Sequence, residues 1–369
     1  MNRIFSIASL AALAAAAPAL AQESGKPAYP SPNAIVEAAP ANEWVKIAPS
    51  DLLVMDLAPD AEGNARRVVI QLMPEPFSQG WIRNIRKLAA AHWWDGTSIN
   101  RVQDNYVVQW GDAGYDNPES GETEQKALPE GLERVPESEY TTDALFTRKI
   151  AQANRMAWQT MAYHFMKNAM NAANAELVVP PNFEEALENG DPDKIHELKK
   201  PDVRDRYANT ASHLLGWPIG NNGVIEAQQY WPIHCYGAVG VGRDYSPDTG
   251  SGAELYTVIG HAPRHLDRNI AVVGRVIEGI EHLSSLPRGK GQLGFYEDAS
   301  KRVPITSIRL GDALAEDPAP AFEYLDTESE VFAKYADARA NRRDPFFIVP
   351  AGGADICNIP VPVRRAKGE

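Results

Sequence analysis

Several residue types and patterns are scarce in this sequence, and each scarcity excludes a class of protein. Cysteine occurs only twice, at Cys235 and Cys357, which is too few for a disulfide-rich scaffold. No long apolar run follows the first 21 residues, so we expect no membrane-spanning helix in the rest. The formal net charge of -13 argues against a nucleic-acid partner, because binding a phosphate backbone requires a basic surface.

Motifs for other common chemistries are also missing. The eight histidines are scattered, and neither HExxH nor CxxC spacing occurs, so we expect no metal ion and no other cofactor. The glycines of GAVGVG (237–242) form neither a GxGxxG fingerprint nor a phosphate-binding P-loop. The sequence also lacks the GxSxG elbow of α/β-hydrolases.

The first 21 residues, MNRIFSIASLAALAAAAPALA, have the features of a secretory signal peptide. Arg3 supplies a basic start, the apolar run is too short to span a bilayer, and small residues precede Gln22. The sequence therefore predicts export, and a composition rich in Ala and Pro, typical of bacterial proteins, indicates the periplasm. Residues 22–42 show no apolar period and predict a flexible leader.

Two interpretations of the cysteines remain open. In an oxidising compartment, Cys235 and Cys357 form one bridge that ties the C-terminal part of the chain to its body. Alternatively they stay unpaired, because the distance between them does not follow from the sequence.

Apolar runs rich in β-branched residues predict strands in two parts of the chain. The runs 51–57 and 65–73 are separated by PDAEGN, which favours a hairpin turn. The stretch 97–112 alternates polar and apolar residues like a further strand. In the second part we expect strands at 235–244, at 253–260, from the turn at 267–269 through Val276, and at 303–312.

Helical periodicity accompanies the strands in each part. A helix is expected over 78–94, with Ser78 as its N-cap, and a short helix is expected to contain Ile280 and Leu283. Antiparallel strands with a helix at each end predict a closed barrel, because closure leaves no exposed sheet edge. The first helix is expected to bury Trp81, Ile85 and Leu88 on one face.

A different composition separates the two strand-rich parts. The run 141–175 predicts a helix with Met side chains on a buried face, and one or two exposed, charged helices follow over 183–206. We therefore expect six segments: signal peptide 1–21, leader 22–42, first half of the barrel 43–112, helical insertion 113–225, second half of the barrel 226–312 and C-terminal extension 313–369.

Two motifs resemble the hallmarks of the cyclophilin family. SINRVQDNYVVQWGD (98–112) is similar to the family's Phe-His-Arg triplet followed by an aromatic residue and a Gln-Gly-Gly-Asp run. RHLDRNIAVVGRVIEGIEHL (264–283) is similar to its Leu-Asp-Gly turn, Val-Val-Phe-Gly-Lys-Val strand and Glu-Gly helix start. The resemblance covers roughly 50–112 and 234–312, and it implies a mainly β, eight-stranded antiparallel barrel capped by two helices.

The resemblance implies a peptidyl-prolyl cis-trans isomerase that acts on proline-containing exported polypeptides without a cofactor. Rotation about an Xaa-Pro bond must break amide resonance, with a barrier of about 18–20 kcal/mol. As the bond twists, the prolyl nitrogen regains its lone pair, and a donor aimed at it stabilises the transition state. Arg101 stands at the position of the family's catalytic arginine. Taken alone, it would be interpreted as a surface arginine.

Other positions imply contacts with the substrate. Gln109 matches the family glutamine that orients the arginine and contacts the substrate backbone, since its amide both donates and accepts. An apolar seat for the proline ring is also implied, although the same side chains are compatible with ordinary barrel packing. The substrate-binding residues that the resemblance implies are Tyr106, Val107, Glu254, Tyr256, His265, Leu266 and Ile270.

The sequence departs from the family pattern near both motifs. Asn100 replaces a histidine, Trp110 replaces a glycine, and Glu254 replaces a glutamine. Ionised Glu254 accepts hydrogen bonds but does not donate them, so one substrate contact is lost or reversed. The alternative function is therefore a catalytically weak or inactive cyclophilin-like chaperone or peptide-binding module.

Overall fold

The computed structural model describes residues 29–114, 124–143, 205, 207–223, 228–315, 320–349 and 352–366. The predicted signal peptide 1–21 lies outside the described residues, as does most of the predicted helical run 141–175. Within the described ranges, no helix combines the length and the apolar character that crossing a membrane requires.

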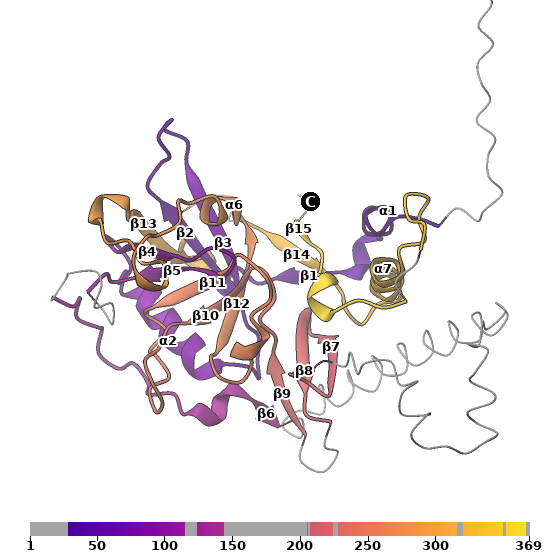
Figure 1. Ribbon diagram of the computed structural model, residues 1–369, viewed down its shortest axis with the longest axis horizontal. Coiled ribbons are helices and arrows are strands. Elements are labelled where there is room, and N and C mark those ends of the chain that lie inside the picture. The colour runs from indigo at the N-terminus through magenta and orange to yellow at the C-terminus, as the bar shows by residue number, and fades with distance from the viewer. Residues whose placement is uncertain are drawn as a thin grey trace, which may run out of the picture.

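Eight antiparallel strands close into a barrel in the order β10-β11-β5-β4-β13-β2-β3-β12 (Figure 1). This confirms the closed eight-stranded barrel that the sequence predicts. β2 and β3 form the expected hairpin, and the last pair before the turn is Leu57 with Arg66. The strands are β2 Leu52–Leu57, β3 Arg66–Leu72, β4 Ser98–Val102, β5 Val107–Gly111, β10 Ala238–Val241, β11 Leu255–Val258, β12 Val272–Glu278 and β13 Val303–Leu310.

The helix α2, Gln79–Ala90, packs on the barrel as predicted, with Trp81, Ile85 and Leu88 fully buried. Ser78 stands at the N-cap position, as predicted, but its side chain makes no capping hydrogen bond. Ser78 has a left-handed backbone, and its hydroxyl donates to the Val272 carbonyl at 2.7 Å. The carboxylate of Glu139 instead accepts from the Gly80 N–H, so a distant side chain caps this helix. The second expected helix is the four-residue α6, Glu281–Ser284.

The stretch 97–112, predicted as one strand, forms the β4–β5 hairpin. The chain reverses at residues 103–106, where Asn105 has a φ of 51°. Asparagine tolerates this left-handed conformation better than most residues, because its short side chain bonds to nearby backbone groups. The alternation of polar and apolar residues continues through the turn, and it therefore hides the reversal.

The described part of the insertion contains strands, which corrects the prediction of a helical segment over 113–225. Its strands and β9 form a four-stranded sheet in the order β6-β9-β8-β7. Leu215 and Gly216 join β7 to β8 with positive φ angles at both positions, as a tight hairpin turn requires. The bounds are β6 Thr142–Asp143, β7 Thr210–Leu214, β8 Trp217–Asn221 and β9 Gln229–Pro232.

This hairpin packs against the barrel through Arg275 of β12. The Arg275 guanidinium donates to the Gly216 carbonyl at 2.8 Å and lies 4.4 Å from the Trp217 ring centroid. Burial lowers the pKa of Arg275 to about 10, so it remains a cation at neutral pH. The insertion is thereby fastened to a barrel strand.

Segments from both ends of the chain form a third sheet beside the barrel (Figure 1). The strand β14 lies between β1 and β15, and α1 packs against α7 through Ile35 and Val36. The expected flexible leader is therefore wrong for residues 32–37, because these apolar side chains find a packing partner in the C-terminal extension. The bounds are β1 Trp44–Ile47, β14 Phe322–Leu325, β15 Val363–Arg365, α1 Pro32–Glu37 and α7 Glu330–Asn341.

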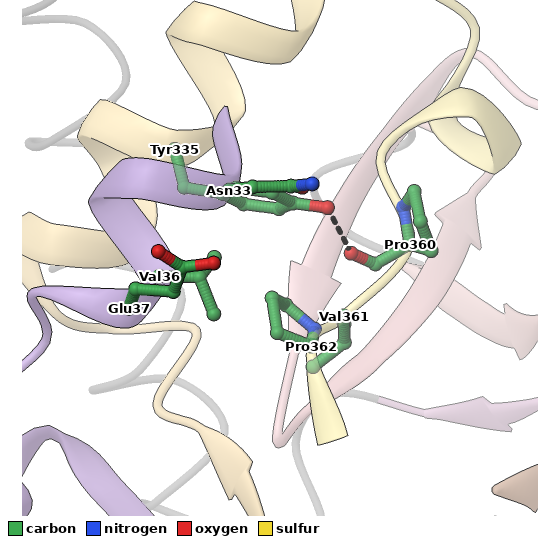
Figure 2. A pocket seen from close by; sticks show the side chains of 7 residues that line it. All are labelled: Asn33, Val36, Glu37, Tyr335, Pro360, Val361 and Pro362. Carbon is green, nitrogen blue, oxygen red and sulfur yellow. Dashed lines mark hydrogen bonds between the residues drawn. The ribbon is translucent and has the colours of Figure 1, made fainter. Parts of the chain in front are cut away.

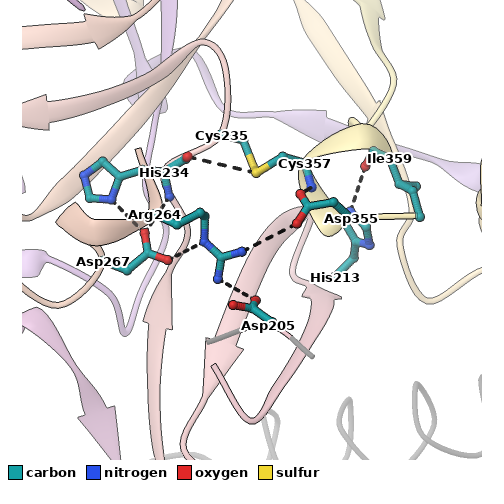
Figure 3. The surroundings of a disulfide bond; sticks show 9 residues. All are labelled: Asp205, His213, His234, Cys235, Arg264, Asp267, Asp355, Cys357 and Ile359. Carbon is teal, nitrogen blue, oxygen red and sulfur yellow. Dashed lines mark hydrogen bonds and ion pairs between the residues drawn. A yellow bond between two sulfur atoms is a disulfide. The ribbon is translucent and has the colours of Figure 1, made fainter. Parts of the chain in front are cut away.

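A disulfide bond joins Cys235 to Cys357, so the first of the two interpretations of the cysteines holds (Figure 3). Two further contacts hold the same C-terminal segment. His213 of β7 binds the Ile359 carbonyl at 2.8 Å, and Asp355 lies 3.9 Å from the Arg264 guanidinium. The extension is thus attached both to the barrel and to the inserted sheet.

Candidate functional site

Arg101, Gln109 and Tyr256 lie side by side on three neighbouring barrel strands. Arg101 of β4 pairs with Gln109 of β5, and Gln109 pairs in turn with Tyr256 of β11. Directly paired residues of an antiparallel sheet point to the same face, so the three side chains share one face. The row continues to Gly240 of β10. The closed barrel therefore brings together residues from both of its halves.

Asn100 forms a bulge in β4 directly before Arg101. The pairing with β5 shifts register between Ile99 and Arg101, and such bulges re-aim the side chain that follows. Asn100 is buried, donates to the Gly111 carbonyl at 3.1 Å and accepts from Ser98 Oγ at 2.6 Å. The residue that departs from the cyclophilin pattern here is thus engaged within the barrel wall.

Three acceptors hold the half-buried guanidinium of Arg101. Nε donates to the Leu293 carbonyl at 2.7 Å, and Nη1 donates to Gln109 Oε1 at 3.2 Å. Nη2 donates to Gln103 Oε1. The two glutamines belong to the β4–β5 hairpin itself, and the carbonyl comes from the turn at 292–294, so contacts from both segments fix the direction of the guanidinium.

Two aromatic rings lie beside the same guanidinium. Its carbon is 5.7 Å from the ring centroid of Tyr106 and 5.4 Å from that of Phe295. Such contacts attract a cation to the ring face and restrict its orientation. Burial raises the pKa of Tyr106, while the positive charge of Arg101 opposes this rise, so the phenol stays neutral at physiological pH.

The segment that holds His265, Leu266 and Ile270 lies against the β4–β5 hairpin. The His265 ring stacks on Tyr106 with centroids 6.3 Å apart and planes inclined by 15°. Leu266 and Ile270 are half-buried and pack on the barrel core, as Tyr106 does. The structure therefore brings His265 onto Tyr106 beside Arg101, while Leu266 and Ile270 pack against the same barrel core.

Val107 and Tyr256 form the buried part of this region, with 3% and 5% of their surfaces exposed. Val107 precedes Gln109 by two positions on β5, so both point to the same face of the sheet. Burial raises the pKa of Tyr256 well above 10, which keeps its phenol protonated. Both side chains belong to the barrel core as well as to the site face.

The carboxylate of Glu254 is engaged at the end of β5. It is buried, and its Oε1 accepts from the Asp112 N–H at 2.7 Å. A Cβ atom at Gly111 would overlap this carboxylate, so the glycine leaves the space that it occupies. The group that was expected to meet the substrate therefore stabilises the strand end.

Sequence reasoning missed Gln103, Leu293 and Phe295. Gln103 follows Arg101 by two positions, and in an extended chain such residues point to the same side. The spacing alone therefore indicates that Gln103 can lie next to Arg101. Leu293 and Phe295 come from the turn Gln292–Gly294 and its next residue. Leu293 contributes its backbone carbonyl, which any residue would supply, so no sequence pattern indicates it.

A separate pocket lies between α1, α7 and the segment before β15 (Figure 2). Tyr335 Oη donates to the Pro360 carbonyl at 2.7 Å at its edge. No barrel strand contributes to it, so it belongs to the packing of the extension and not to the Arg101 cluster. Its lining residues are Asn33, Val36, Glu37, Tyr335, Pro360, Val361 and Pro362.

Comparisons with known proteins bear on the family and the fold of this chain. Residues 61–310 match the family model described as cyclophilin type peptidyl-prolyl cis-trans isomerase/CLD. The crystal structure of the cyclophilin AquaCyp293 from Hirschia baltica is similar over 88% of this chain and 95% of its own, with a TM-score of 0.54 and 18% identity. At that identity the likeness shows the fold alone.

A cyclophilin-type peptidyl-prolyl cis-trans isomerase from Cryptosporidium parvum, crystallised in the presence of the dipeptide Ala-Pro, is more distant. It aligns with 70% of this chain and 98% of its own, with a TM-score of 0.32 and 10% identity. None of the curated protein sequences matches this chain.

Proposed function

Because this chain belongs to the cyclophilin-type peptidyl-prolyl cis-trans isomerase family, we propose that it accelerates rotation about Xaa-Pro bonds in exported proteins. One observation carries the proposal. The guanidinium of Arg101 is held by Gln109, Gln103 and Leu293 beside the apolar cluster around Tyr106. A fixed cation next to an apolar surface suits a reaction that makes and breaks no covalent bond.

In this proposal Arg101 donates a hydrogen bond to the prolyl nitrogen as the bond twists. The nitrogen is a poor acceptor in the planar amide, because its lone pair is delocalised, and it becomes a good one at the transition state. An arginine stays protonated, and its planar fork is rigid. A donor that is already oriented needs no reorganisation during the reaction. Each tenfold gain in rate requires about 1.4 kcal/mol of such differential binding.

The cluster beside Arg101 supplies a seat for the proline ring. We assign its surface to the half-buried Tyr106, Leu266 and Ile270, with His265 stacked on Tyr106. The buried Val107 and Tyr256 support the seat from within the barrel wall. Glu254 contributes indirectly, because its hydrogen bond to the Asp112 N–H fixes the end of β5.

Gln109 has two partners in the proposed complex. Its Oε1 accepts from Arg101, and we assign its amide N–H groups to a carbonyl of the substrate backbone. The orientation of the arginine and the alignment of the peptide are thereby set by the same side chain.

We also propose that the protein works in the periplasm after removal of residues 1–21. The bridge between Cys235 and Cys357 supports this location, since disulfide bonds persist in oxidising compartments. Its substrates there are proline-containing polypeptides that have just been exported.

NMR exchange spectroscopy on a short Ala-Pro peptide tests the proposed activity. The wild-type protein is expected to accelerate cis-trans exchange, and Arg101→Ala is expected to lower kcat about 100-fold, as loss of a transition-state donor does. Arg101→Lys keeps the charge but loses the planar guanidinium with its fixed donors, so we expect an intermediate rate. Arg309→Ala removes an arginine of β13 that pairs with Asp95, and this control is expected to retain full activity.

Thermal unfolding of each variant shows whether the fold is intact. A wild-type protein without exchange catalysis, or a folded Arg101→Ala variant with wild-type rates, would contradict the proposal. Peptide binding or suppression of aggregation without catalysis would favour the alternative, a cyclophilin-like binding module.

A further inference from the structure

A chain of buried hydrogen bonds runs from Tyr256 to Arg264 behind the candidate site. Tyr256 Oη lies 2.8 Å from His234 Nε2, and His234 Nδ1 lies 2.9 Å from Asp267 Oδ1. The other carboxylate oxygen of Asp267 accepts from Arg264 Nε at 2.6 Å. Figure 3 shows the part from His234 to Arg264. The His234 and Asp267 side chains have no exposed surface, so water does not compete for these bonds.

The chemistry of Asp267 sets the direction of its hydrogen bonds. The Asp267 carboxylate only accepts, so His234 Nδ1–H donates a hydrogen bond to it. A neutral His234 then presents a lone pair at Nε2, which accepts from the Tyr256 hydroxyl. With this tautomer every polar atom from Tyr256 Oη to Arg264 Nε has a partner, as buried groups require.

Gly240 confines the Tyr256 hydroxyl to this position. The two residues are paired across β10 and β11, and a Cβ atom at Gly240 would overlap the hydroxyl. On the other side, the His234 ring lies nearly parallel to the Tyr256 ring, at an angle of 7°. The hydroxyl is therefore held between Gly240, which leaves room for it, and His234, which accepts its hydrogen bond.

The same carboxylate also fixes the wall of the proposed proline seat. Asp267 Oδ1 accepts from the backbone N–H of His234 at 3.0 Å as well as from its ring. Asp267 and Arg264 flank His265 and Leu266 in one short segment. A displacement of His234 would therefore shift the Tyr256 ring and this segment together.

We propose that His234 and Asp267 are positioning residues, which hold the Tyr256 ring and the 264–270 segment at the spacing that a proline ring requires. The inference rests on the proposed isomerase function. Neither residue touches the substrate; they act through the Tyr256 hydroxyl and through the 264–270 segment, of which Asp267 is a part. When the hydroxyl has its acceptor the ring is held in one place; when the acceptor is lost, a buried donor is left unpaired and the ring moves.

Four variants separate this role from simple support of the fold. Tyr256→Phe removes only the hydroxyl. His234→Asn retains a donor near Nδ1 but lacks an acceptor at Nε2, whereas His234→Gln places an amide oxygen near Nε2. We expect the first two variants to lower kcat about tenfold each, with a smaller change in KM. Their double variant is expected to be no slower than either one, because both changes remove the same contact. His234→Gln is expected to stay within about threefold of the wild type.

The readouts are peptide exchange rates at saturation, the peptide affinity, and the ¹⁵N spectrum of His234 without peptide, which reports its tautomer. His213→Asn is the control, because it removes the hydrogen bond of another histidine to the Ile359 carbonyl, away from the site. We expect it to leave kcat unchanged. The positioning role would be overturned if the losses in kcat were additive in the double variant. It would also be overturned if these losses followed the unfolding temperature of the variants, or if the spectrum showed a proton on His234 Nε2.

The two proposals fail in different ways. Wild-type protein without catalysis overturns the proposed function. If the wild-type protein is active and both Tyr256→Phe and His234→Asn keep kcat within twofold of the wild type, only the inference about positioning is overturned.

Discussion

Gly240 and Tyr256 are paired across β10 and β11, and the space of the missing side chain at Gly240 is taken by the Tyr256 hydroxyl. We expect Gly240→Ala to lower the free energy of unfolding by about 1–3 kcal/mol, as overpacking does. The proposed exchange activity should fall about tenfold with it, because the methyl group displaces the ring. Urea unfolding and peptide exchange measure the two effects.

Gly353→Ala is a matched control, since a Cβ atom at Gly353 would meet nothing within 4 Å. It should change neither quantity. A Gly240→Ala variant as stable and as active as the wild type would show that the ring tolerates the extra methyl group.

Gln103 is expected to orient the proposed catalytic arginine. Its Oε1 accepts from Arg101 Nη2, so Gln103→Leu removes one of the contacts that fix the guanidinium. We expect kcat to fall about three- to tenfold, with little change in peptide affinity, because small misplacements of a reacting group slow the chemical step. NMR line-shape analysis separates the two quantities. Gln228→Leu, which loses a hydrogen bond to Tyr230 outside the site, should retain the wild-type rate.

The stability of the protein should depend on pH through His213. Burial lowers the pKa of this imidazole from 6.5 to about 4, although its hydrogen bond to the Ile359 carbonyl opposes the shift. Between these pH values the unfolded chain binds more protons than the folded one. The free energy of unfolding should therefore decrease as the pH falls through this range, by roughly 2–3 kcal/mol in total.

Urea unfolding at about pH 7 and about pH 4.5 measures this loss. His213→Asn does not titrate in the range and should show a smaller difference. The same pH dependence in both proteins would assign the effect to other groups.

The bridge between Cys235 and Cys357 should contribute strongly to stability. It spans a sequence separation of 122 residues, and closing so long a loop in the unfolded chain corresponds to about 4–5 kcal/mol. The double variant Cys235→Ser and Cys357→Ser should lose about this much in denaturant unfolding. Wild-type protein treated with a reductant should shift to the same midpoint. A midpoint that a reductant leaves unchanged would contradict the prediction.

The barrel was predictable because most of its strands coincide with short apolar runs in the sequence. The runs 51–57 and 65–73 are nearly continuous apolar stretches, and Leu53, Met55 and Ile70 are fully buried. The two motifs that resemble cyclophilins lie on strands and turns that meet around Arg101. Short-range patterns were enough to place these elements.

Other features depend on contacts between distant segments. The β7–β8 turn places Leu215 at a φ of 53°, a conformation that leucine does not favour, so its sequence gives no turn signal. The six-residue α1 is too short to be stable alone and relies on packing against α7. The Leu293 carbonyl that binds Arg101 is a backbone group, which every residue type has, so the sequence does not indicate this contact.

The pairing of β1 with β14 sets a limit on how the chain can be shortened. The strand β1 stands near the beginning of the described residues, and its partner lies beyond the segment that matches the family model. A version trimmed to residues 61–310 would lose all three strands of that sheet, Cys357 and also the barrel strand β2. Trimming only one end would leave β14 or β1 with an unsatisfied edge, a surface that invites association with other chains. The two ends are best kept together, or removed together at points that leave β2 in place.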